Sequence, residues 1–344
     1  MTVKTIILIP SYNGKKFLDE CLESVLNQSA LNFKAVLIDD GSTDDTIEYV
    51  KKNFSQVDIL ALNKNCGFAR AINEGIKYCL AKYDPDYIAL LNNDTRVDWD
   101  WLASLLSALD GQPNIAAAAS NMLFYDRPDI INSQGGTCSI WGHGQDINVN
   151  KKISEVDLKP GFILSPCFGA ALLRVKSLKD IGLLDERYFA YYEDLDWGWR
   201  ANIMGYKIIF EPRAIVYHYG SGTWGDRTFE KDYLCLRNAL CTIIKNYEFK
   251  NILRVLISGG LFFYLRISFD YLNNLRIKKG KIIVIYQEIT LKKRLKLALL
   301  PFKITAWNLK NLKETIALRK TVQTKRRVND REISRYFKNR LNKS

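Results

Sequence analysis

Four ionisable side chains lie close together in the segment EDLDWGWR, residues 193–200. They are Glu193, Asp194, Asp196 and Arg200. A helix turns about 100° per residue, so Glu193 would share a face with Asp196 and Arg200. Asp194 would point elsewhere and could face a cleft. The spacing thus separates Asp194 from its charged neighbours.

A histidine follows this segment at the end of an expected strand. Residues 207–210 and 214–218 are rich in β-branched and aromatic side chains, which predicts two short strands, the second ending in His218. The other histidine, His143, lies in the loop-rich residues 122–160, where we expect an exposed or acceptor-facing side chain. Carboxylates with a histidine at a strand end could form a metal-assisted transfer site. A solvated acidic helix beside a buried histidine explains this stretch alone equally well.

Strands and helices are predicted to alternate in the first part of the chain. Four apolar runs predict buried strands: residues 3–9, 33–38, 57–62 and 87–91. Segments with helical spacing separate them. This alternation predicts an α/β architecture, with a mostly parallel central sheet flanked by helices. The ligand site of such a sheet lies beyond the carboxyl ends of its strands.

Polar side chains follow three of these predicted strands. Tyr12 follows the first, Asp39 and Asp40 end the second, and residues 92–94 (Asn-Asn-Asp) end the fourth. Each cluster alone could be a capped turn, but three on one sheet edge favour a ligand site. No GxGxxG follows the first strand and no GxxxxGK[ST] occurs, so a dinucleotide fold of the usual kind is not expected.

Charge is distributed unevenly along the 344 residues. The whole chain has 50 Lys and Arg against 37 Asp and Glu, a net charge of +13. Residues 1–245 carry 26 basic and 31 acidic side chains, whereas residues 246–344 carry 24 and 6. We therefore expect an acidic body and a basic, mainly helical C-terminal region. A basic region of this kind usually has nucleic acid or an anionic membrane as its partner.

Apolar stretches interrupt the basic region. Residues 255–265 are uncharged but too few to span a bilayer as a helix, which takes about 20 residues. The apolar pieces 282–286 and 297–307 lie between basic clusters, which suits amphipathic helices in a membrane interface. Packing of these helices on the body is the other interpretation. Nucleic acid is disfavoured because carboxylates line the sheet edge of the body.

Cysteines and the N-terminus indicate a cellular setting. The seven cysteines occur singly, without a CxxC pair, which is typical of reduced thiols in a cytosolic protein. The first apolar run meets Pro10 at once, so we interpret it as a strand and not as a signal sequence. We expect a cytoplasmic protein, peripheral on the inner face of the membrane.

The order and spacing of seven motifs resemble the inverting glycosyltransferases of family 2, which have the GT-A fold. The motifs are IPSYNG (9–14), IDDGSTDDT (38–46), NKNCGFARAINEGI (63–76), LLNNDT (90–95), GAALLRV (169–175), DERYFAYYEDLDWGWR (185–200) and HYGSGT (218–223). The resemblance covers about residues 4–245 and implies a GT-A domain at 1–245. Within the family the chain looks most like the bacterial rhamnosyltransferase-type branch. RNALCTIIKN and TAWNLKNLKETIALRK in the basic region are also similar to that branch.

The resemblance implies roles for individual residues. Asp194 matches the catalytic base. Contacts to the donor nucleotide fall on Pro10, Tyr12, Asp39, Asp40, Arg70 and Asn93. Ligands of a divalent cation, Mg²⁺ or Mn²⁺, fall on Asp94, His218 and Asn92; at Asn92 the family pattern has an aspartate instead. Residues that shape the acceptor side or brace the base are Glu193, Trp197 and Arg200.

The implied reaction is transfer of a sugar, best guess rhamnose from dTDP-rhamnose, to a hydroxyl of a lipid-linked or polysaccharide acceptor. The products would be O-antigen, capsule or rhamnan chains. A UDP-hexose or UDP-N-acetylhexosamine donor is an alternative, because the nucleoside motifs do not separate uracil from thymine. A nucleic-acid- or membrane-binding protein and a non-catalytic scaffold are alternatives of another class. Whether the chain forms a homo-oligomer is left open.

Overall fold

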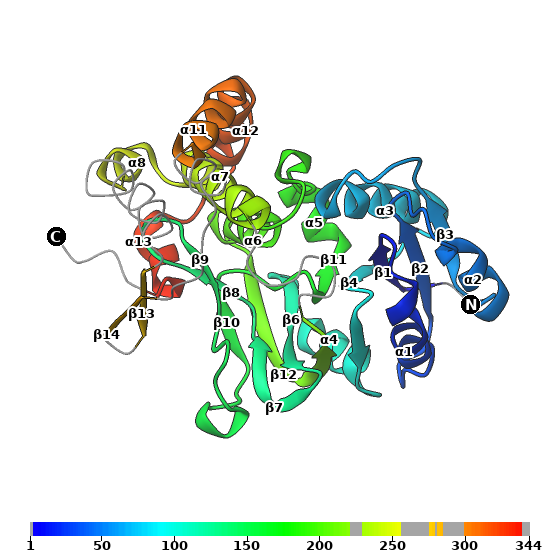
Figure 1. The fold of residues 1–344 in the computed structure, drawn as a ribbon. Coiled ribbons are helices and arrows are strands. Elements are labelled where there is room, and N and C mark those ends of the chain that lie inside the picture. Colours follow the sequence, from blue (N-terminus) through cyan, green and yellow to red (C-terminus); the bar gives the residue numbers. More distant parts are fainter. Residues whose placement is uncertain (1–2, 221–228, 256–274, 279–280, 285–298, 339–344) are drawn as a thin grey trace.

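The computed structural model describes residues 3–220, 229–255, 275–278, 281–284 and 299–338, and places a central sheet between layers of helices (Figure 1). Its strands are β1 Thr5–Ser11, β2 Phe33–Asp39, β3 Asp58–Ala61, β4 Tyr87–Leu91, β5 Thr95–Val97, β6 Ile115–Phe124, β7 Arg127–Ser133, β8 Gly136–Cys138, β9 Gly144–Asp146, β10 Gly161–Ile163, β11 Ala170–Arg174, β12 Lys207–His218, β13 Leu275–Lys278 and β14 Lys281–Val284. Its α-helices are α1 Lys15–Leu26, α2 Thr46–Asn53, α3 Phe68–Lys82, α4 Trp101–Leu109, α5 Val175–Ile181, α6 Glu193–Ile203, α7 Phe229–Asn246, α8 Phe249–Val255, α11 Leu300–Lys310, α12 Leu312–Thr324 and α13 Asp330–Ile333. Short 3₁₀ helices occur at Ile153–Glu155, Glu186–Tyr188 and Ser334–Tyr336.

The main sheet is mixed. Its order is β10-β12-β6-β11-β4-β1-β2-β3, with β5 added beside β12 and β7 beside β6. The pairs β1–β2, β1–β4, β2–β3 and β6–β12 are parallel, as expected. Strand β11 is antiparallel to both β4 and β6 and joins the two parallel halves. The predicted α/β fold is confirmed, but fewer of its strand pairs are parallel than the alternation suggested.

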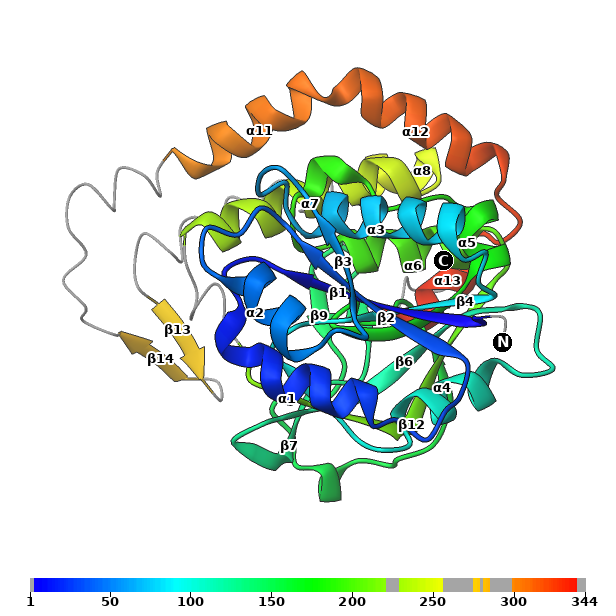
Figure 2. The ribbon, with the colours of Figure 1, turned by 90° about the vertical axis from the view of Figure 1, so that its right-hand side faces the viewer.

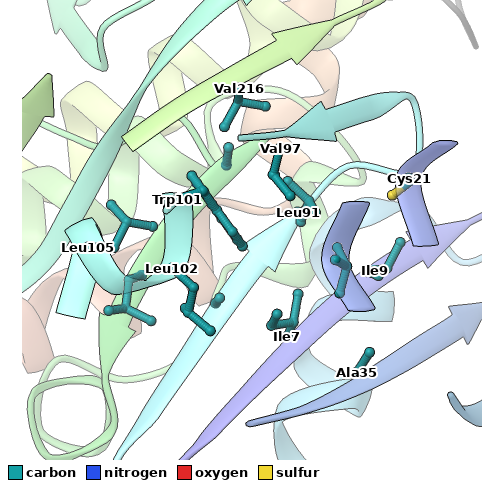
Figure 3. Packing of buried hydrophobic residues seen from close by; sticks show 14 of the residues in the cluster. Ile7, Ile9, Cys21, Ala35, Leu91, Val97, Trp101, Leu102, Leu105 and Val216 are labelled. Carbon is teal, nitrogen blue, oxygen red and sulfur yellow. The ribbon is translucent and has the colours of Figure 1, made fainter. Parts of the chain in front are cut away.

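Both faces of the inner strands are buried, which explains their continuous apolar sequence. Side chains alternate along each strand, so Ile7 and Ile9 of β1 pack under α1 and α4, whereas Ile6 and Leu8 pack under α3. Figure 3 shows the first of these clusters, in which Trp101 of α4 lies against the sheet. The result is a rigid platform whose strands end at a common edge.

Two local predictions need correction. The expected strands at 207–210 and 214–218 are one strand, β12, with an irregular register between Glu211 and Ile215. Pro212 lies in that irregularity, and it has no N–H to give to the ladder. Residues 122–160, expected to be loop-rich, contain β7, β8 and β9.

The described part of the C-terminal region packs on the body. Leu300 and Val322 are buried in a cluster that also holds Trp199, Tyr247 and Phe337. Helices α11 and α12 lie over α7 on the outside of the molecule (Figures 1 and 2). Among the residues with described structure, every helix is too short or too polar to cross a membrane. The uncharged run predicted at 255–265 lies outside the described residues, except for Val255.

Candidate active site

The polar clusters expected at the strand ends do meet at one edge. Strand β1 pairs in parallel with β2 on one side and with β4 on the other, so their carboxyl ends are neighbours. Asn93 Nδ2, just after β4, donates to Ser11 Oγ at the end of β1 over 3.0 Å. Tyr12 follows directly and is 37% exposed, so its ring is accessible at this edge.

The two aspartates after β2 have different environments. Asp40 accepts hydrogen bonds from the backbone N–H of Cys66 at 2.9 Å and of Gly67 at 3.0 Å, which fixes the loop leading into α3. Asp39 Oδ2 accepts from Ser42 N at 3.0 Å. Its buried Oδ1 accepts no hydrogen bond from the described residues. Asp39 Oδ1 is therefore a buried acceptor at this strand end that has no hydrogen-bond donor among the described residues.

Asp94 and His218 lie side by side although 124 positions separate them in sequence. The antiparallel pairing of β5 with β12 brings them together, because it places Thr95 opposite His218. His218 Nε2 is 3.2 Å from Asp94 Oδ1, and His218 Nδ1 is 3.0 Å from Asn132 Oδ1. With Asn132 Oδ1 accepting a hydrogen bond from the Nδ1–H group, the lone pair of Nε2 faces a carboxylate oxygen.

This pair fits a divalent cation. A cation between a bare imidazole nitrogen and a carboxylate oxygen would satisfy both lone pairs. Asn92 lies close by in sequence; its backbone carbonyl oxygen accepts from Thr95 Oγ1 and its backbone N–H donates to Gly169 O, contacts that fix its backbone and do not involve its side-chain amide. Within the described part of the chain, no group of three or more His, Cys, Asp or Glu side chains could hold a metal ion. The pair is therefore at most part of a metal site.

The backbone that leads into α6 is strained. Residues 188–192, called here the lead-in turn, contain three non-glycine residues with positive φ: Phe189 (66°), Tyr191 (68°) and Tyr192 (73°). A residue other than glycine adopts such a φ angle at a free-energy cost of about 1 kcal/mol or more. Asp194, the second residue of α6, follows at once. The strained backbone thus immediately precedes the helix turn that orients the Asp194 side chain.

Burial and neighbouring charge alter the acidity of Asp194. Burial raises its pKa to about 7, helped by the negative charge of Asp146 and opposed by the backbone N–H groups of Leu195 and Phe168. The pKa of Glu193 is raised as well, by burial and then by the charge of Asp194. A carboxylate with a pKa near 7 is matched to general base catalysis at neutral pH.

The other predicted support residues anchor α6. Trp197 Nε1 donates to Gly182 O at 3.0 Å, and the ring is fully buried. Arg200 pairs with Asp196 at 2.9 Å and donates to Ile181 O at 3.0 Å. Both side chains fasten α6 to the segment before the lead-in turn. These contacts hold the helix in place.

Asp146 was missed by the sequence analysis. Ser133 Oγ donates to it at 2.7 Å, and its negative charge raises the pKa of Asp194. It is therefore an acidic neighbour that acts on the predicted base. It ends the short strand β9 in the stretch expected to be loop-rich, and no recognisable motif surrounds it. Strand β9 reaches the lead-in turn because Gly144 N donates to Tyr192 Oη at 2.7 Å.

The remaining residues singled out in the sequence lie around the strand-end edge. Arg70 is about half exposed on the first turn of α3, and its Nε is 3.8 Å from Glu186 Oε2. Pro10 lies within β1, one residue before its end. His143, expected to be exposed or acceptor-facing, is half-buried, with its Nδ1 3.3 Å from Gln145 Nε2. The structure thus brings Asp94 and His218 into contact and places Asp146 near enough to Asp194 for its charge to act on it, while most of the nucleotide-side residues lie along the adjoining strand ends.

A mixed sheet with carboxylates at its strand ends and a carboxylate at a facing helix start defines the class of GT-A nucleotide-sugar transferases. The chain belongs to glycosyl transferase family 2, whose sequence model matches residues 6–182. The family and fold predicted from the motifs are thereby confirmed.

Curated relatives of the chain include poly-beta-1,6-N-acetyl-D-glucosamine synthases. That of Staphylococcus epidermidis is 29% identical over 215 residues, 61% of this chain and 48% of the relative. The chain therefore spans about half the length of the curated relatives it matches.

Solved structures with a similar fold include GalNAc-T7 with UDP, GalNAc and Mn²⁺, with a TM-score of 0.60, 16% identity, and coverage of 90% of this chain and 58% of that one. The mannosyltransferase PcManGT from Pyrobaculum calidifontis, in complex with GDP-Man and Mn²⁺, has a TM-score of 0.54 and 14% identity, covering 94% of this chain and 87% of that one. At such identities the likeness shows the fold alone.

Proposed function

We propose that this protein is an inverting glycosyltransferase that moves a sugar from a nucleotide diphosphate donor to a hydroxyl group of a glycan or lipid-linked glycan. The observation that carries the proposal is the placement of Asp194. It follows a strained turn at the start of α6, and its pKa of about 7 suits a base at neutral pH. Family membership supports the same reaction class.

In this mechanism Asp194 accepts the proton of the acceptor hydroxyl while that oxygen attacks the anomeric carbon. The bond from the anomeric carbon to the diphosphate breaks in the same displacement, and attack from the opposite face inverts the centre. The carboxylates at the end of β2 would accept a hydrogen bond from the base of the nucleotide; Asp39 Oδ1 accepts none from the described residues. A divalent cation held by Asp94 and His218 would offset the charge that develops on the departing diphosphate.

For the donor we propose dTDP-rhamnose, on the strength of the motifs shared with the rhamnosyltransferase-type branch. A UDP-N-acetylhexosamine is the second candidate, because the curated relatives are named N-acetylglucosamine polymer synthases. Calorimetric binding of dTDP, UDP and GDP, with and without Mn²⁺, separates the two. Metal-dependent preference for dTDP supports rhamnose transfer, and preference for UDP supports the alternative. Failure to bind any of them would contradict the enzyme proposal.

Asp194→Asn tests the base. General base catalysis contributes about 10²–10⁴-fold, so turnover should fall by that factor while nucleotide affinity stays the same. Asp84→Asn is the matched control, since Asp84 is 89% exposed and lies before the amino end of β4, opposite the site. Unchanged turnover in Asp194→Asn would disprove the assignment.

Asp94→Ala tests the metal ligand. Loss of the carboxylate should weaken nucleotide binding in Mn²⁺ and leave the weaker metal-free binding unaltered, because the cation joins the side chain to the diphosphate. Titrations with and without chelator measure this difference. If binding by the variant depends on metal as strongly as that of the wild type, Asp94 is not a ligand.

We further propose that the protein binds the anionic inner face of the membrane through α11 and α12. Phe302 and Leu309 are 72% and 65% exposed, and exposed lysines flank them, among them Lys303, Lys310 and Lys313. Apolar side chains framed by lysine suit an interface of acidic lipid. The net charge of +18 in residues 246–344, from 24 basic and 6 acidic side chains, supports the same partner.

Co-sedimentation with phosphatidylglycerol–phosphatidylcholine vesicles tests this surface. Wild-type protein should bind them, and should bind pure phosphatidylcholine much less. Phe302→Ser should weaken binding, whereas Leu31→Ser, which alters a residue 81% exposed on the body, should not. Equal binding by both variants would argue against the α11–α12 surface.

A further inference from the structure

Helix α7 contains the segment RNALCTIIKN, residues 237–246, to which the sequence analysis gave no role. Its apolar residues face the core, as expected for a helix. Its polar residues are buried as well: Arg237, Asn238, Lys245 and Asn246. All four contact the lead-in turn or the residues on either side of it. Buried polar side chains of this kind need full sets of partners, which makes their geometry exacting.

Asn238 holds the lead-in turn directly. Its Nδ2 lies within hydrogen-bond distance of three carbonyl oxygens there, Tyr188 O at 3.1 Å, Ala190 O at 3.1 Å and Tyr191 O at 2.8 Å, and its two hydrogens are shared among them. Its Oδ1 accepts from Arg237 Nε at 3.1 Å. The side chain is fully buried, so water cannot replace these contacts. One amide group thus binds carbonyl oxygens that lie next to or within the residues of positive φ.

Arg237 extends the same support by one residue. Its Nη2 donates to Arg187 O at 3.0 Å and to Tyr188 O at 3.2 Å. The guanidinium lies over the Trp307 ring of α11 at 4.4 Å, which fixes its plane. The backbone before and within the lead-in turn is therefore held by two neighbouring side chains of α7.

The far end of α7 holds the two sides of the lead-in turn together. Lys245 Nζ pairs with Asp185 at 2.8 Å before the turn and with Asp196 at 3.0 Å after it. Asn246 Nδ2 donates to Asp196 Oδ1 at 3.0 Å. These contacts hold the residues on both sides of the lead-in turn. They do not involve the carbonyl groups within the turn, which Asn238 contacts.

We propose that Asn238 is the positioning residue of the catalytic base: by binding the carbonyls of residues 188, 190 and 191 it holds the strained lead-in turn and so aims Asp194 at the acceptor. The proposal rests on the role of Asp194 proposed above. Asn238 does not touch the reacting groups itself. Without it the turn can relax towards negative φ angles, and the first turn of α6 rotates with it. A displacement of about 1 Å at a reacting group can reduce a rate on the order of 100-fold.

Asn238→Ala tests this role, with Asn308→Ala as the matched control. Asn308 is also a buried amide that donates to α7, at Arg237 O over 3.2 Å, but it does not contact the lead-in turn. Turnover of the preferred nucleotide sugar, with water as acceptor if none is known, should fall on the order of 100-fold in Asn238→Ala. Nucleotide affinity should not change, because the groups assigned to the nucleotide lie at the ends of β1, β2 and β4 and on α3, and the hydrogen bonds of Asn238 go to none of these elements. Asn308→Ala should keep its turnover.

Hydrogen exchange provides a readout that does not depend on activity. Amides of residues 188–196 should exchange faster in Asn238→Ala, while those of β1 and β4 keep their protection. Uniformly faster exchange in both segments would indicate general destabilisation and overturn the proposal. Asn238→Ser, which keeps one donor at the site, serves if the alanine variant does not fold, and should show an intermediate rate.

The outcomes separate this proposal from the proposed function. Full turnover in Asp194→Asn contradicts the base assignment, whatever Asn238 does. An inactive Asp194→Asn together with wild-type turnover and exchange in Asn238→Ala contradicts the positioning role alone. Turnover lost equally in Asn238→Ala and Asn308→Ala would mean that any gap beside α7 has this effect, and would also overturn it.

Discussion

Asp194 has to be ionised to accept a proton, yet its surroundings favour the protonated form. Burial is the main cause, and the charge of Asp146 adds to it. A base of higher pKa binds a proton more tightly once it is ionised, so the same surroundings make it more effective. Asp146 therefore tunes Asp194, and this effect could not be predicted from a sequence in which 48 positions separate the two.

Asp146→Asn should move the pH dependence of the reaction. In the wild type, kcat/KM should fall as pH decreases through about 7, because Asp194 then takes up a proton. Removing the charge of Asp146 lowers the pKa of Asp194, so the fall should begin at lower pH. The pH profile of both proteins, with Asp84→Asn as control, measures the shift. An unchanged midpoint would show that Asp146 does not act on the base.

Glu193 should make the protein less stable as pH rises. Burial, then the charge of Asp194, raises its pKa from 4.5 to about 8, and its Oε2 accepts no hydrogen bond from the described residues. Between these values the folded state holds a proton that the unfolded chain has released, so the free energy of unfolding decreases through this window.

Glu193→Gln removes that proton equilibrium while keeping the shape of the side chain. Its Tm should exceed that of the wild type at pH 8, by about 2–4 °C for each kcal/mol gained, and by much less at pH 5. Thermal unfolding at the two pH values measures the difference. An equal gain at both would point to a cause other than ionisation.

At the scale of elements, hydrophobic patterns predicted those strands whose limits are set by the residues within and next to them. Strands β1, β2 and β4 follow from apolar runs, and their polar ends from the residues that stop each run. The position of β11 does not follow in this way, because its partners β4 and β6 are chosen by the whole sheet. Nor does β12, where an apolar pattern interrupted at Pro212 continues as one strand. The role of α7 depends on contacts about 50 residues apart, which no periodicity reports.

The buried ion pairs of α7 lead to a prediction for that element. Lys245 is 2% exposed between Asp185 and Asp196, so Lys245→Met removes the cation that these two buried carboxylates share and leaves Asp185 with Arg187 and Asp196 with Arg200. Loss of one partner of a buried pair costs about 3–5 kcal/mol when the charge is left uncompensated, so with these arginines present we expect about 2–3 kcal/mol. Lys77→Met removes an exposed pair with Glu74 and should cost about 1 kcal/mol at most. Urea unfolding compares them; similar values for both would show that the buried pairs contribute little.

At the scale of the whole molecule, the basic region is tied to the catalytic body by a helix end. Arg319 Nη1 and Gln323 Nε2, both on α12, donate to Ile244 O at 2.8 Å and Lys245 O at 3.1 Å at the C-terminus of α7. The positive charge of Arg319 also interacts favourably with the partial negative charge at the C-terminal end of the helix. The net charge of this region allows two interpretations, membrane binding and packing on the body. The structure assigns packing to one face of α12 and leaves another face exposed.

Two phenylalanines of the basic region separate these faces experimentally. Phe337 is buried, with its ring centroid 5.1 Å from that of Trp199 and 6.2 Å from that of Tyr247. Phe337→Ala should therefore cost about 3–5 kcal/mol of the free energy of unfolding. Phe302 is 72% exposed, so Phe302→Ser should change stability by about 0.5 kcal/mol or less.

Vesicle binding should respond in the opposite way, because Phe302 lies on the surface proposed for lipid and Phe337 does not. Measured at a temperature where Phe337→Ala is still folded, that variant should bind phosphatidylglycerol vesicles like the wild type. Phe302→Ser should be stable but bind weakly. If Phe302→Ser unfolds as easily as Phe337→Ala, the α11–α12 surface is part of the packed core and not a membrane surface.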